Sequence, residues 1–300
     1  MKEKTKCKKC RLLIDSDLET CPYCGYKQDE PADKTKPEVI EKEPEQPKKI
    51  HFFDFPSRAL DVSITKSTLY FFAGLIFLQI FVLFFNIISA TNDHFAHTTA
   101  GGAAINFSIY FIIFGIMLLI TNSDITKITN DFKKGSTWIL GIGFGFLMMI
   151  VSSAVSLIFK SIAPSTGVNS NEQAVDTMTS LYPFLATIVF GFLGPICEEF
   201  TYRAGLFNIL KRFNRILAYI GVALIFGLIH FNFQAFGTDE IVTELVNIPS
   251  YIVSGLLLCY FYEYGGLGAS ILAHITNNFV AVLLQILMGA IWNVSYLVFI

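Results

Sequence analysis

The stretch LYPFLATIVFGFLGPICEEFTYRAGLFNIL, residues 181–210, is long and apolar enough to cross a membrane, yet it contains three neighbouring charged side chains. They are Glu198, Glu199 and Arg203. A charge at the centre of a bilayer costs about 3 kcal/mol or more, so ionisable residues in membrane spans usually have a function. The stretch therefore predicts a membrane-embedded helix that carries part of a functional site.

The composition of the whole chain agrees with a membrane protein. Hydrophobic residues make up 53% of its 300 residues and charged residues only 15%, which is too apolar for a water-soluble chain of this length. Runs of about 20 apolar residues predict transmembrane helices. Seven such runs cover residues 69–90, 104–121, 137–160, 181–200, 215–231, 248–262 and 267–290, and the fourth continues as a helix to about residue 212. The predicted fold class is an all-α, polytopic transmembrane helix bundle of about seven spans.

The distribution of Lys and Arg predicts how the bundle lies in the cell membrane. Lys and Arg residues precede the first apolar run, follow the second and lie in the turn at residues 211–215. Residues 91–103 and 232–247 contain none. By the positive-inside rule, the N-terminus is cytosolic and the C-terminus is outside. We expect residues 232–247 to form an outer or partly re-entrant loop, which leaves the sixth span short. We expect no cleavable signal peptide, because the apolar runs begin only near Leu69.

Four cysteines near the N-terminus predict a small metal-binding domain. Residues 1–26 contain two CxxC pairs, formed by Cys7, Cys10, Cys21 and Cys24. Two such pairs are typical of a structural zinc site in which four thiolates surround the ion. A redox dithiol is the alternative, but it needs only one pair. We therefore expect a cytosolic zinc ribbon in which bound zinc supplies most of the folding free energy.

The segment between the ribbon and the first span is predicted to be a linker, residues 27–67. Its first part, to about Lys49, is rich in charge and proline and has few apolar residues, which is typical of a disordered tether. Residues 51–67 contain aromatic side chains that suit the membrane interface. Residues 68–160 then form the N-terminal transmembrane helices.

Further polar residues lie within the later spans. They are His230, His274 and Asn278, the last two spaced i, i+4 on one helix face. At 1.5 Å per residue, Glu198 and His230 lie roughly 20 Å from the turn near residues 211–215, and His274 lies roughly 15 Å from the same side. We therefore expect three helices to bring these side chains to a similar depth.

The spacing along the fourth span suggests separate roles for its two glutamates. Glu199 and Arg203 are spaced i, i+4, so an internal ion pair is the least costly way to bury both. Glu198 lies about 100° around the helix from Glu199 and can point elsewhere. A carboxylate beside imidazoles and an amide suits water activation and the stabilisation of an oxyanion.

The three motifs together resemble the CPBP family of intramembrane endopeptidases, which includes type II CAAX prenyl proteases and the bacteriocin-processing ABI enzymes. The motifs are Glu198-Glu199-x-x-x-Arg203, Phe226-x-x-x-His230 and His274-x-x-x-Asn278, and the resemblance covers about residues 181–290. It implies that Glu198 and His230 activate water. It also implies that His274 and Asn278 stabilise the oxyanion, while Glu199 and Arg203 brace the site.

Several alternatives stay open from the sequence. The family is often described as metalloproteases, and His230, His274 and a glutamate are possible zinc ligands, so a catalytic metal is left open. A non-enzymatic bacteriocin-immunity or membrane interaction protein is one alternative function, and a transporter with an ion relay is another. The expected partners are the lipid bilayer, a peptide or membrane-protein substrate and a cytosolic docking partner of the ribbon, with no nucleic acid.

Overall fold

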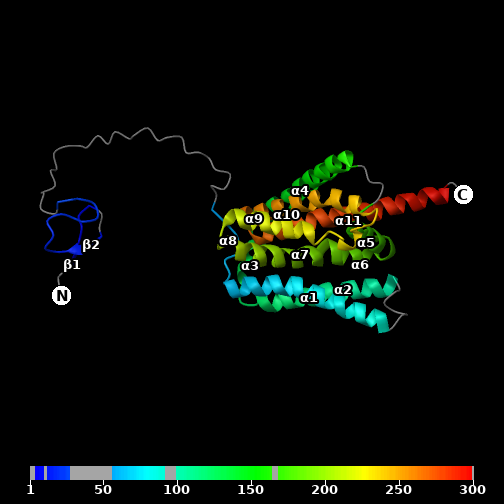
Figure 1. The fold of residues 1–300 in the computed structure, drawn as a ribbon, viewed down its shortest axis with the longest axis horizontal. Coiled ribbons are helices and arrows are strands. Elements are labelled where there is room, and N and C mark those ends of the chain that lie inside the picture. The colour runs from blue at the N-terminus through cyan, green and yellow to red at the C-terminus, as the bar shows by residue number, and fades with distance from the viewer. Residues whose placement is uncertain (1–3, 10–11, 28–55, 92–98, 164–167, 299–300) are drawn as a thin grey trace. The chain divides into compact units, whose positions relative to one another are not determined.

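The chain divides into two compact units in a computed structural model that describes residues 4–9, 12–27, 56–91, 99–163 and 168–298. The units are Met1–Asp54 and Phe55–Ile300, and Figure 1 labels their elements.

The first unit is a short hairpin followed by a knuckle-like turn. Strand β1, Lys4–Lys6, pairs antiparallel with β2, Leu13–Asp15, so that Lys4 faces Asp15. Gly25 has a φ of 68° and its N–H donates to the carbonyl oxygen of Cys21 at 2.9 Å, which closes the second turn. Among the described residues of this unit, the buried cluster consists of Cys7, Ile14 and Cys21, with Tyr26 packed against it. A core of this size needs additional support, as small domains generally do.

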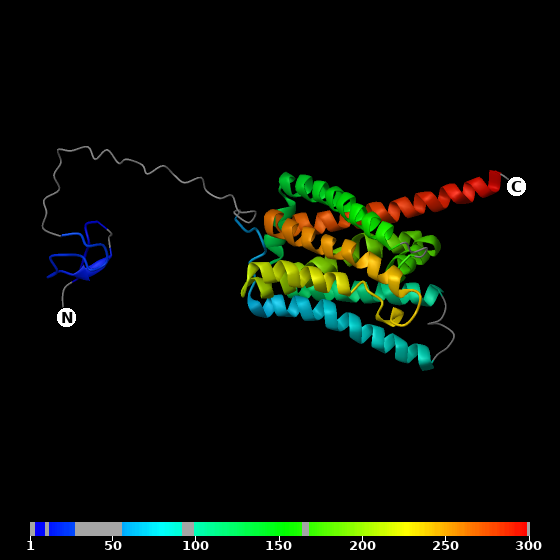
Figure 2. The same ribbon diagram turned by 45° about the horizontal axis from the view of Figure 1, so that its top comes forward.

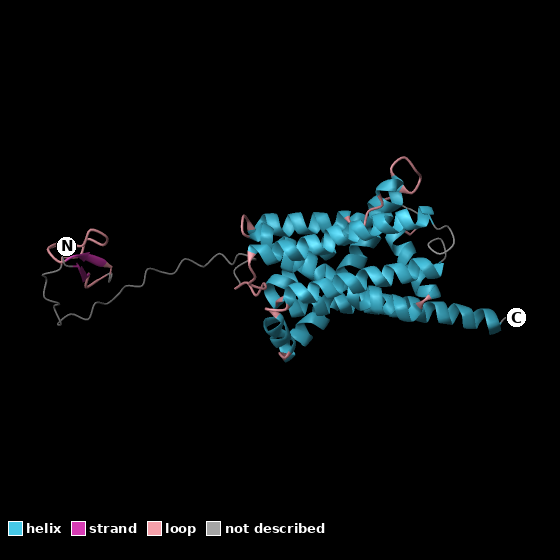
Figure 3. Cartoon of the chain, turned by 90° about the horizontal axis from the view of Figure 1, so that it is seen from below, coloured by secondary structure: helices cyan, strands magenta, loops and turns pink. Residues whose placement is uncertain are grey.

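The second unit consists of helices, as predicted (Figure 3). In chain order the long helices are α1 Ile64–Thr91, α2 Thr99–Thr121, α4 Gly135–Ile162, α10 Ile241–Gly265 and α11 Leu267–Val298. Shorter helices are α3 Ile125–Phe132, α5 Ser170–Leu181, α9 Arg215–Leu228 and the 3-10 turn η3 Phe233–Ala235. Between α5 and α9 runs a continuous helical rod, Pro183–Lys211. It comprises α6 Pro183–Ala186, η1 Thr187–Leu193, α7 Gly194–Glu198, η2 Glu199–Phe207 and α8 Asn208–Lys211.

Five of the described helices are long and apolar enough to cross a membrane. They are Ala100–Thr121, Gly135–Ile162, Pro183–Lys211, Ile241–Gly265 and Leu267–Gly289. Two shorter apolar segments, Ile64–Ile76 and Arg215–Leu228, match the remaining predicted spans. Large apolar side chains on these helices, such as Leu119, Ile139 and Phe184, are more than three-quarters exposed, as expected for lipid-facing positions. The prediction of an all-α, multi-pass membrane fold is therefore confirmed.

The rod is central to the packing of the helical unit. Figure 1 shows the rod between two sets of helices, the pair α1 and α2 and the group α4, α10 and α11. Within the rod, η2 packs against α1, and η1 packs against α11. Turned by 45°, the view shows α4 crossing close to α11 (Figure 2). Glycines make this crossing close, because a Cβ built on Gly145 would lie 2.7 Å from the carbonyl oxygen of Ala273.

The structure corrects two boundaries of the predicted spans. Helix α10 begins at Ile241, so residues 241–247 are helical rather than part of a loop, and the sixth span is not short. The cause is Glu244, which is 2% exposed and accepts hydrogen bonds from the backbone N–H and hydroxyl of Ser170, both 2.7 Å, and from the N–H of Asn232, 3.1 Å. These bonds hold the first turns of α10 against α5.

The second correction concerns the start of the helical unit. Helix α1 begins at Ile64 rather than Leu69, and residues 56–63 before it are bonded to helix ends. The N–H of Leu60 donates to the hydroxyl of Tyr262 at 2.9 Å, and the amide of Asn208 donates to the carbonyl oxygen of Leu60 at 2.9 Å. Residues 28–55, most of the predicted tether, lie outside the described residues, and the predicted domain boundaries stay predictions.

The close crossing of α4 and α11 generates a test. We expect Gly145→Ala to lower the free energy of unfolding by about 1–3 kcal/mol, because the added methyl group meets backbone that cannot easily move. Gly143→Ala is the matched control on the same helix, since nothing lies within 4 Å of a Cβ there. It should leave stability unchanged or raise it slightly. Unfolding of the detergent-solubilised proteins measures both, and equal effects would contradict the packing described.

Candidate active site and candidate metal centre

The rod contains π-helical segments on both sides of Glu198, and Pro195 accounts for the first. Proline has no N–H, so the carbonyl oxygen of Gly191 has no i+4 donor. The N–H of Gly194 donates instead to the carbonyl oxygen of Val189, five residues earlier, which widens the turn. The sequence pattern predicts regular α-helical turns here and does not indicate this π-helix. Such bulges are frequent at functional sites.

Glu199 is the central buried charge of the helical unit. Its side chain is fully buried, and one carboxylate oxygen lies 3.1 Å from Nη1 of Arg203 and 2.9 Å from Nδ1 of His274. The hydroxyl of Ser270 donates to the other oxygen. The ion pair expected from the i, i+4 spacing is present. The link to α11 through His274 and Ser270 is an addition that the spacing alone did not indicate.

Arg203 connects this carboxylate to two further helices. Its side chain is fully buried, and Nη2 donates to the carbonyl oxygen of Gly255 in α10 at 3.4 Å. Its guanidinium carbon lies 4.7 Å from the ring centroid of Phe226 in α9, a cation–π distance. The charge is therefore balanced by Glu199 and solvated by groups on α9 and α10.

His274 lies between the two neighbouring glutamates. Its Nδ1 faces Glu199, and its Nε2 lies 3.7 Å from Oε2 of Glu198. Because a carboxylate only accepts, Nδ1 carries a proton, and Nε2 is the ring nitrogen directed toward Glu198. The side chain of Glu198 is 21% exposed, unlike that of Glu199. The two glutamates thus have different surroundings, as their positions around the helix predict.

His230 follows the end of α9 and is held by its own helix. Its Nδ1 lies 2.7 Å from the carbonyl oxygen of Phe226, so Nδ1 carries the proton and Nε2 of the neutral ring is left as a proton acceptor. The ring stacks on Tyr251 of α10 with centroids 4.3 Å apart and an angle of 11°. The Tyr251 hydroxyl accepts hydrogen bonds from the amides of Asn169 and Asn171 at 3.3 and 3.1 Å. Tyr251 belongs to no sequence motif.

Asn278 has a fixed amide orientation. Its Nδ2 donates to the carbonyl oxygen of Phe190 at 3.3 Å, and its Oδ1 accepts from Nδ2 of Asn277 at 2.9 Å. A primary amide has two N–H groups, so one donor stays available for a ligand.

A cavity of about 760 Å³ brings four of the six predicted site residues together. Glu198, His230, His274 and Asn278 all line it, and Tyr110 and Tyr251 add two phenol groups. Glu199 and Arg203 do not line the cavity and lie behind its wall, where they contact His274 and α10. The arrangement offers a partly exposed carboxylate, two imidazoles and an amide donor to one bound molecule.

These features define a multi-pass membrane protein with a polar site inside its helix bundle, and comparison with known families agrees. Residues 180–280 match the family model described as type II CAAX prenyl endopeptidase Rce1-like. This segment contains all six predicted site residues. The family expected from the three motifs is therefore confirmed for this part of the chain.

One relative among curated proteins has low sequence identity to this chain. A protein of Mycoplasma capricolum subsp. capricolum, named only as an uncharacterized protein, is 24% identical over 231 residues. The match covers 70% of this chain and 65% of the relative, so the chain spans slightly less than two thirds of that protein's length. No solved structure matches the chain.

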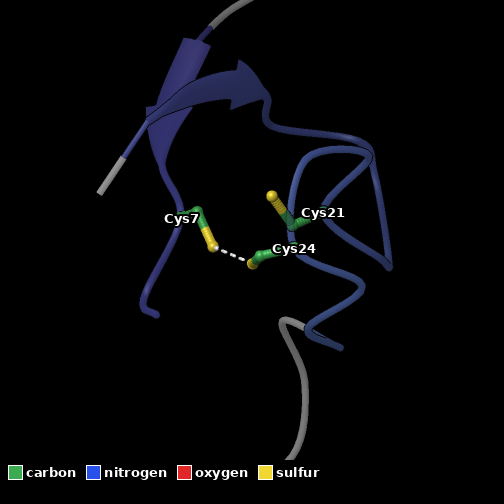
Figure 4. A group of neighbouring side chains, drawn as sticks. All are labelled: Cys7, Cys21 and Cys24. Carbon is green, nitrogen blue, oxygen red and sulfur yellow. Dashed lines mark hydrogen bonds between the residues drawn. The ribbon is translucent and has the colours of Figure 1, made fainter. Parts of the chain in front are cut away.

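The N-terminal unit contains a candidate metal centre. The sulfur atoms of Cys7, Cys21 and Cys24 all lie within 4.8 Å of one another, and those of Cys7 and Cys24 are 3.7 Å apart (Figure 4). Tetrahedral thiolates at 2.3 Å from a metal have sulfurs roughly 3.8 Å apart, so the cluster fits an ion. Cys10 lies outside the described residues. Within the described residues, this is the only group of three or more metal-binding side chains that converges this closely.

Proposed function

We propose that this protein is an intramembrane endopeptidase that hydrolyses a peptide bond in a peptide precursor or a membrane-protein substrate. The observation that carries the proposal is the convergence of Glu198, His230, His274 and Asn278 on one cavity within the helix bundle. The family match over residues 180–280 supports it. In this proposal the bundle lies in the cell membrane with the N-terminus in the cytosol, as the distribution of Lys and Arg predicts.

The proposed reaction begins with a water molecule between Glu198 and His230. Glu198 takes a proton from this water as its oxygen bonds to the carbonyl carbon of the substrate. His274 and Asn278 donate to the oxygen that becomes negative, and the buried carboxylate of Glu199 stabilises positive charge on His274. The C–N bond then breaks, and the proton taken by Glu198 moves to the leaving nitrogen, which gives a carboxylate and an amine.

Glu199 and Arg203 act in this proposal as positioning residues, because neither lines the cavity. Tyr251 has the same role toward His230, whose ring it fixes by stacking. The alternative is a non-enzymatic bacteriocin-immunity or membrane interaction protein on the same scaffold. It does not account for a partly exposed glutamate next to a histidine whose other nitrogen is bound to a second, buried glutamate.

The catalytic assignment leads to a direct experiment. We expect Glu198→Gln, His230→Ala and His274→Ala each to lower cleavage by at least about 100-fold, the scale on which a general base or an oxyanion donor contributes. Glu198→Gln should leave the amount of protein in the membrane unchanged, since its side chain is partly exposed to the cavity. The membrane peptidomes of the wild type and this variant, compared by mass spectrometry, identify the products.

Two results of that experiment distinguish a loss of catalysis from a loss of folded protein. Arg203→Ala should lower the amount of membrane protein as well, because it leaves Glu199 as an unpaired buried charge, which costs about 3–5 kcal/mol. Near-normal cleavage by the Glu198→Gln protein would disprove the assignment.

We also propose that the N-terminal cysteines bind structural zinc and that the ribbon docks a cytosolic partner or substrate. We expect purified full-length protein to contain about one zinc ion per chain through Cys7, Cys10, Cys21 and Cys24. Cys21→Ser with Cys24→Ser should remove it, and Cys197→Ser, in the helical unit, should not. Elemental analysis measures this, and zinc that stays stoichiometric in the double variant would place a metal at the membrane site.

A further inference from the structure

We propose that the cavity binds an extended, unprenylated peptide segment, which enters past the start of α5 and carries a basic residue about six residues from the scissile bond. This inference rests on the proposed endopeptidase function and names the class of its substrate. It is drawn from the length of the cavity, the hydrogen-bonding groups along its walls and the charges at its mouth.

The length of the cavity follows from the pairing of α4 with α11. Gly141 packs against Ala269 and Leu272, and Gly145 packs against Ala273 and Thr276, so the two helices run in the same direction and Gly145 is level with His274. The cavity lining on α4 extends to Lys160, which lies at the mouth of the cavity together with Glu172 and Asp176 of α5. Fifteen residues of helix separate Gly145 from Lys160, or roughly 22 Å. An extended chain advances about 3.3 Å per residue, so about six residues fit between the site and the mouth.

The walls along this path offer hydrogen-bond acceptors. Ser152, Ser153 and Ser156 of α4 and Ser250 and Ser254 of α10 line the cavity. The hydroxyls of Ser152 and Ser254 donate to carbonyl oxygens of their own helices at 2.8 and 2.9 Å. Their remaining lone pairs are therefore available to accept from the N–H groups of a substrate backbone.

Helix α11 adds amides to the same path. The amides of Asn277 and Gln285 line the cavity, and the Oε1 atom of Gln285 is buried without a hydrogen-bond partner within the described structure. An unsatisfied buried acceptor costs about 1–3 kcal/mol. A peptide N–H satisfies such an acceptor, whereas an isoprenoid chain would leave the Gln285 Oε1 atom desolvated and unpaired. These polar groups therefore favour a peptide backbone, with no prenyl group, along this side of the cavity.

The mouth of the cavity has an excess of negative charge. Nζ of Lys160 lies 4.0 Å from Oε2 of Glu172, and Asp176 follows one turn later on α5 and is exposed. All three residues line the cavity, which gives two carboxylates for one ammonium group. A basic substrate side chain compensates the excess. Because these groups are partly exposed, we expect a preference of about two- to fivefold.

The test uses the full-length protein, reconstituted in liposomes, and two peptide mixtures. One mixture contains unmodified 14-residue peptides of random sequence, and the other carries the same sequences with one farnesylated cysteine. We expect cleavage of the unmodified mixture that is lost in Glu198→Gln. The products, read by mass spectrometry, should be enriched in Lys or Arg about six residues from the cleaved bond.

Variants at the mouth test the charge preference. Glu172→Gln with Asp176→Asn should lower the enrichment of basic residues about two- to fivefold, and Lys160→Glu should raise it. The matched control, Asp239→Asn with Glu240→Gln, removes two exposed carboxylates that do not line the cavity and should change nothing. Unchanged enrichment in all of the mouth variants would overturn the assignment of the mouth.

The outcomes also separate this inference from the proposed function. Glu198-dependent cleavage of the farnesylated mixture alone would overturn the inference and leave the endopeptidase function standing. No Glu198-dependent product from either mixture would count against the endopeptidase function itself, and the inference would fall with it.

Discussion

The buried carboxylate of Glu199 is the group on which the arrangement of the site depends. A charge in the interior of a membrane protein must be compensated, because its desolvation costs several kcal/mol. Arg203 provides the opposite charge, while His274 and Ser270 donate hydrogen bonds from α11. Arg203 in turn reaches Gly255 on α10 and Phe226 on α9. One negative charge thereby sets the relative positions of the rod and three other helices.

The same constraint gives two adjacent glutamates different properties. Glu199 is fully buried and has all its partners within the protein, whereas Glu198 is partly exposed to the cavity and lies 3.7 Å from Nε2 of His274. A buried carboxylate that holds a histidine and a second carboxylate that faces a bound water form a common division of roles in hydrolytic sites. His230 is fixed separately, by its own helix and by Tyr251.

Much of this could be predicted from the sequence because it depends on local spacing. The length of apolar runs gave the spans, and the i, i+4 spacing of Glu199 and Arg203 gave the ion pair. The CxxC spacing gave the cysteine cluster, apart from Cys10, which the structure does not describe. These features depend only on residues close together in the chain.

The features that were missed depend on contacts between distant segments or on backbone detail. The π-helical turn before Glu198 results from a missing N–H at Pro195, and its effect depends on how neighbouring helices pack. The extension of α10 to Ile241 depends on Glu244 binding Ser170, which is 74 residues away. Tyr251 and Ser270 belong to no motif, and only the folded chain brings them to His230 and Glu199.

A double-mutant cycle tests most directly whether Glu199 organises the site. The free energy of unfolding is measured for Glu199→Gln, His274→Ala and the double variant, with Glu199→Gln and Asn278→Ala as the control pair. Contact between Glu199 and His274 predicts a coupling free energy of about 0.5–3 kcal/mol for the first pair. The control pair should be additive, because Asn278 bonds to Phe190 and Asn277 instead. Additive effects of Glu199→Gln and His274→Ala would contradict the account.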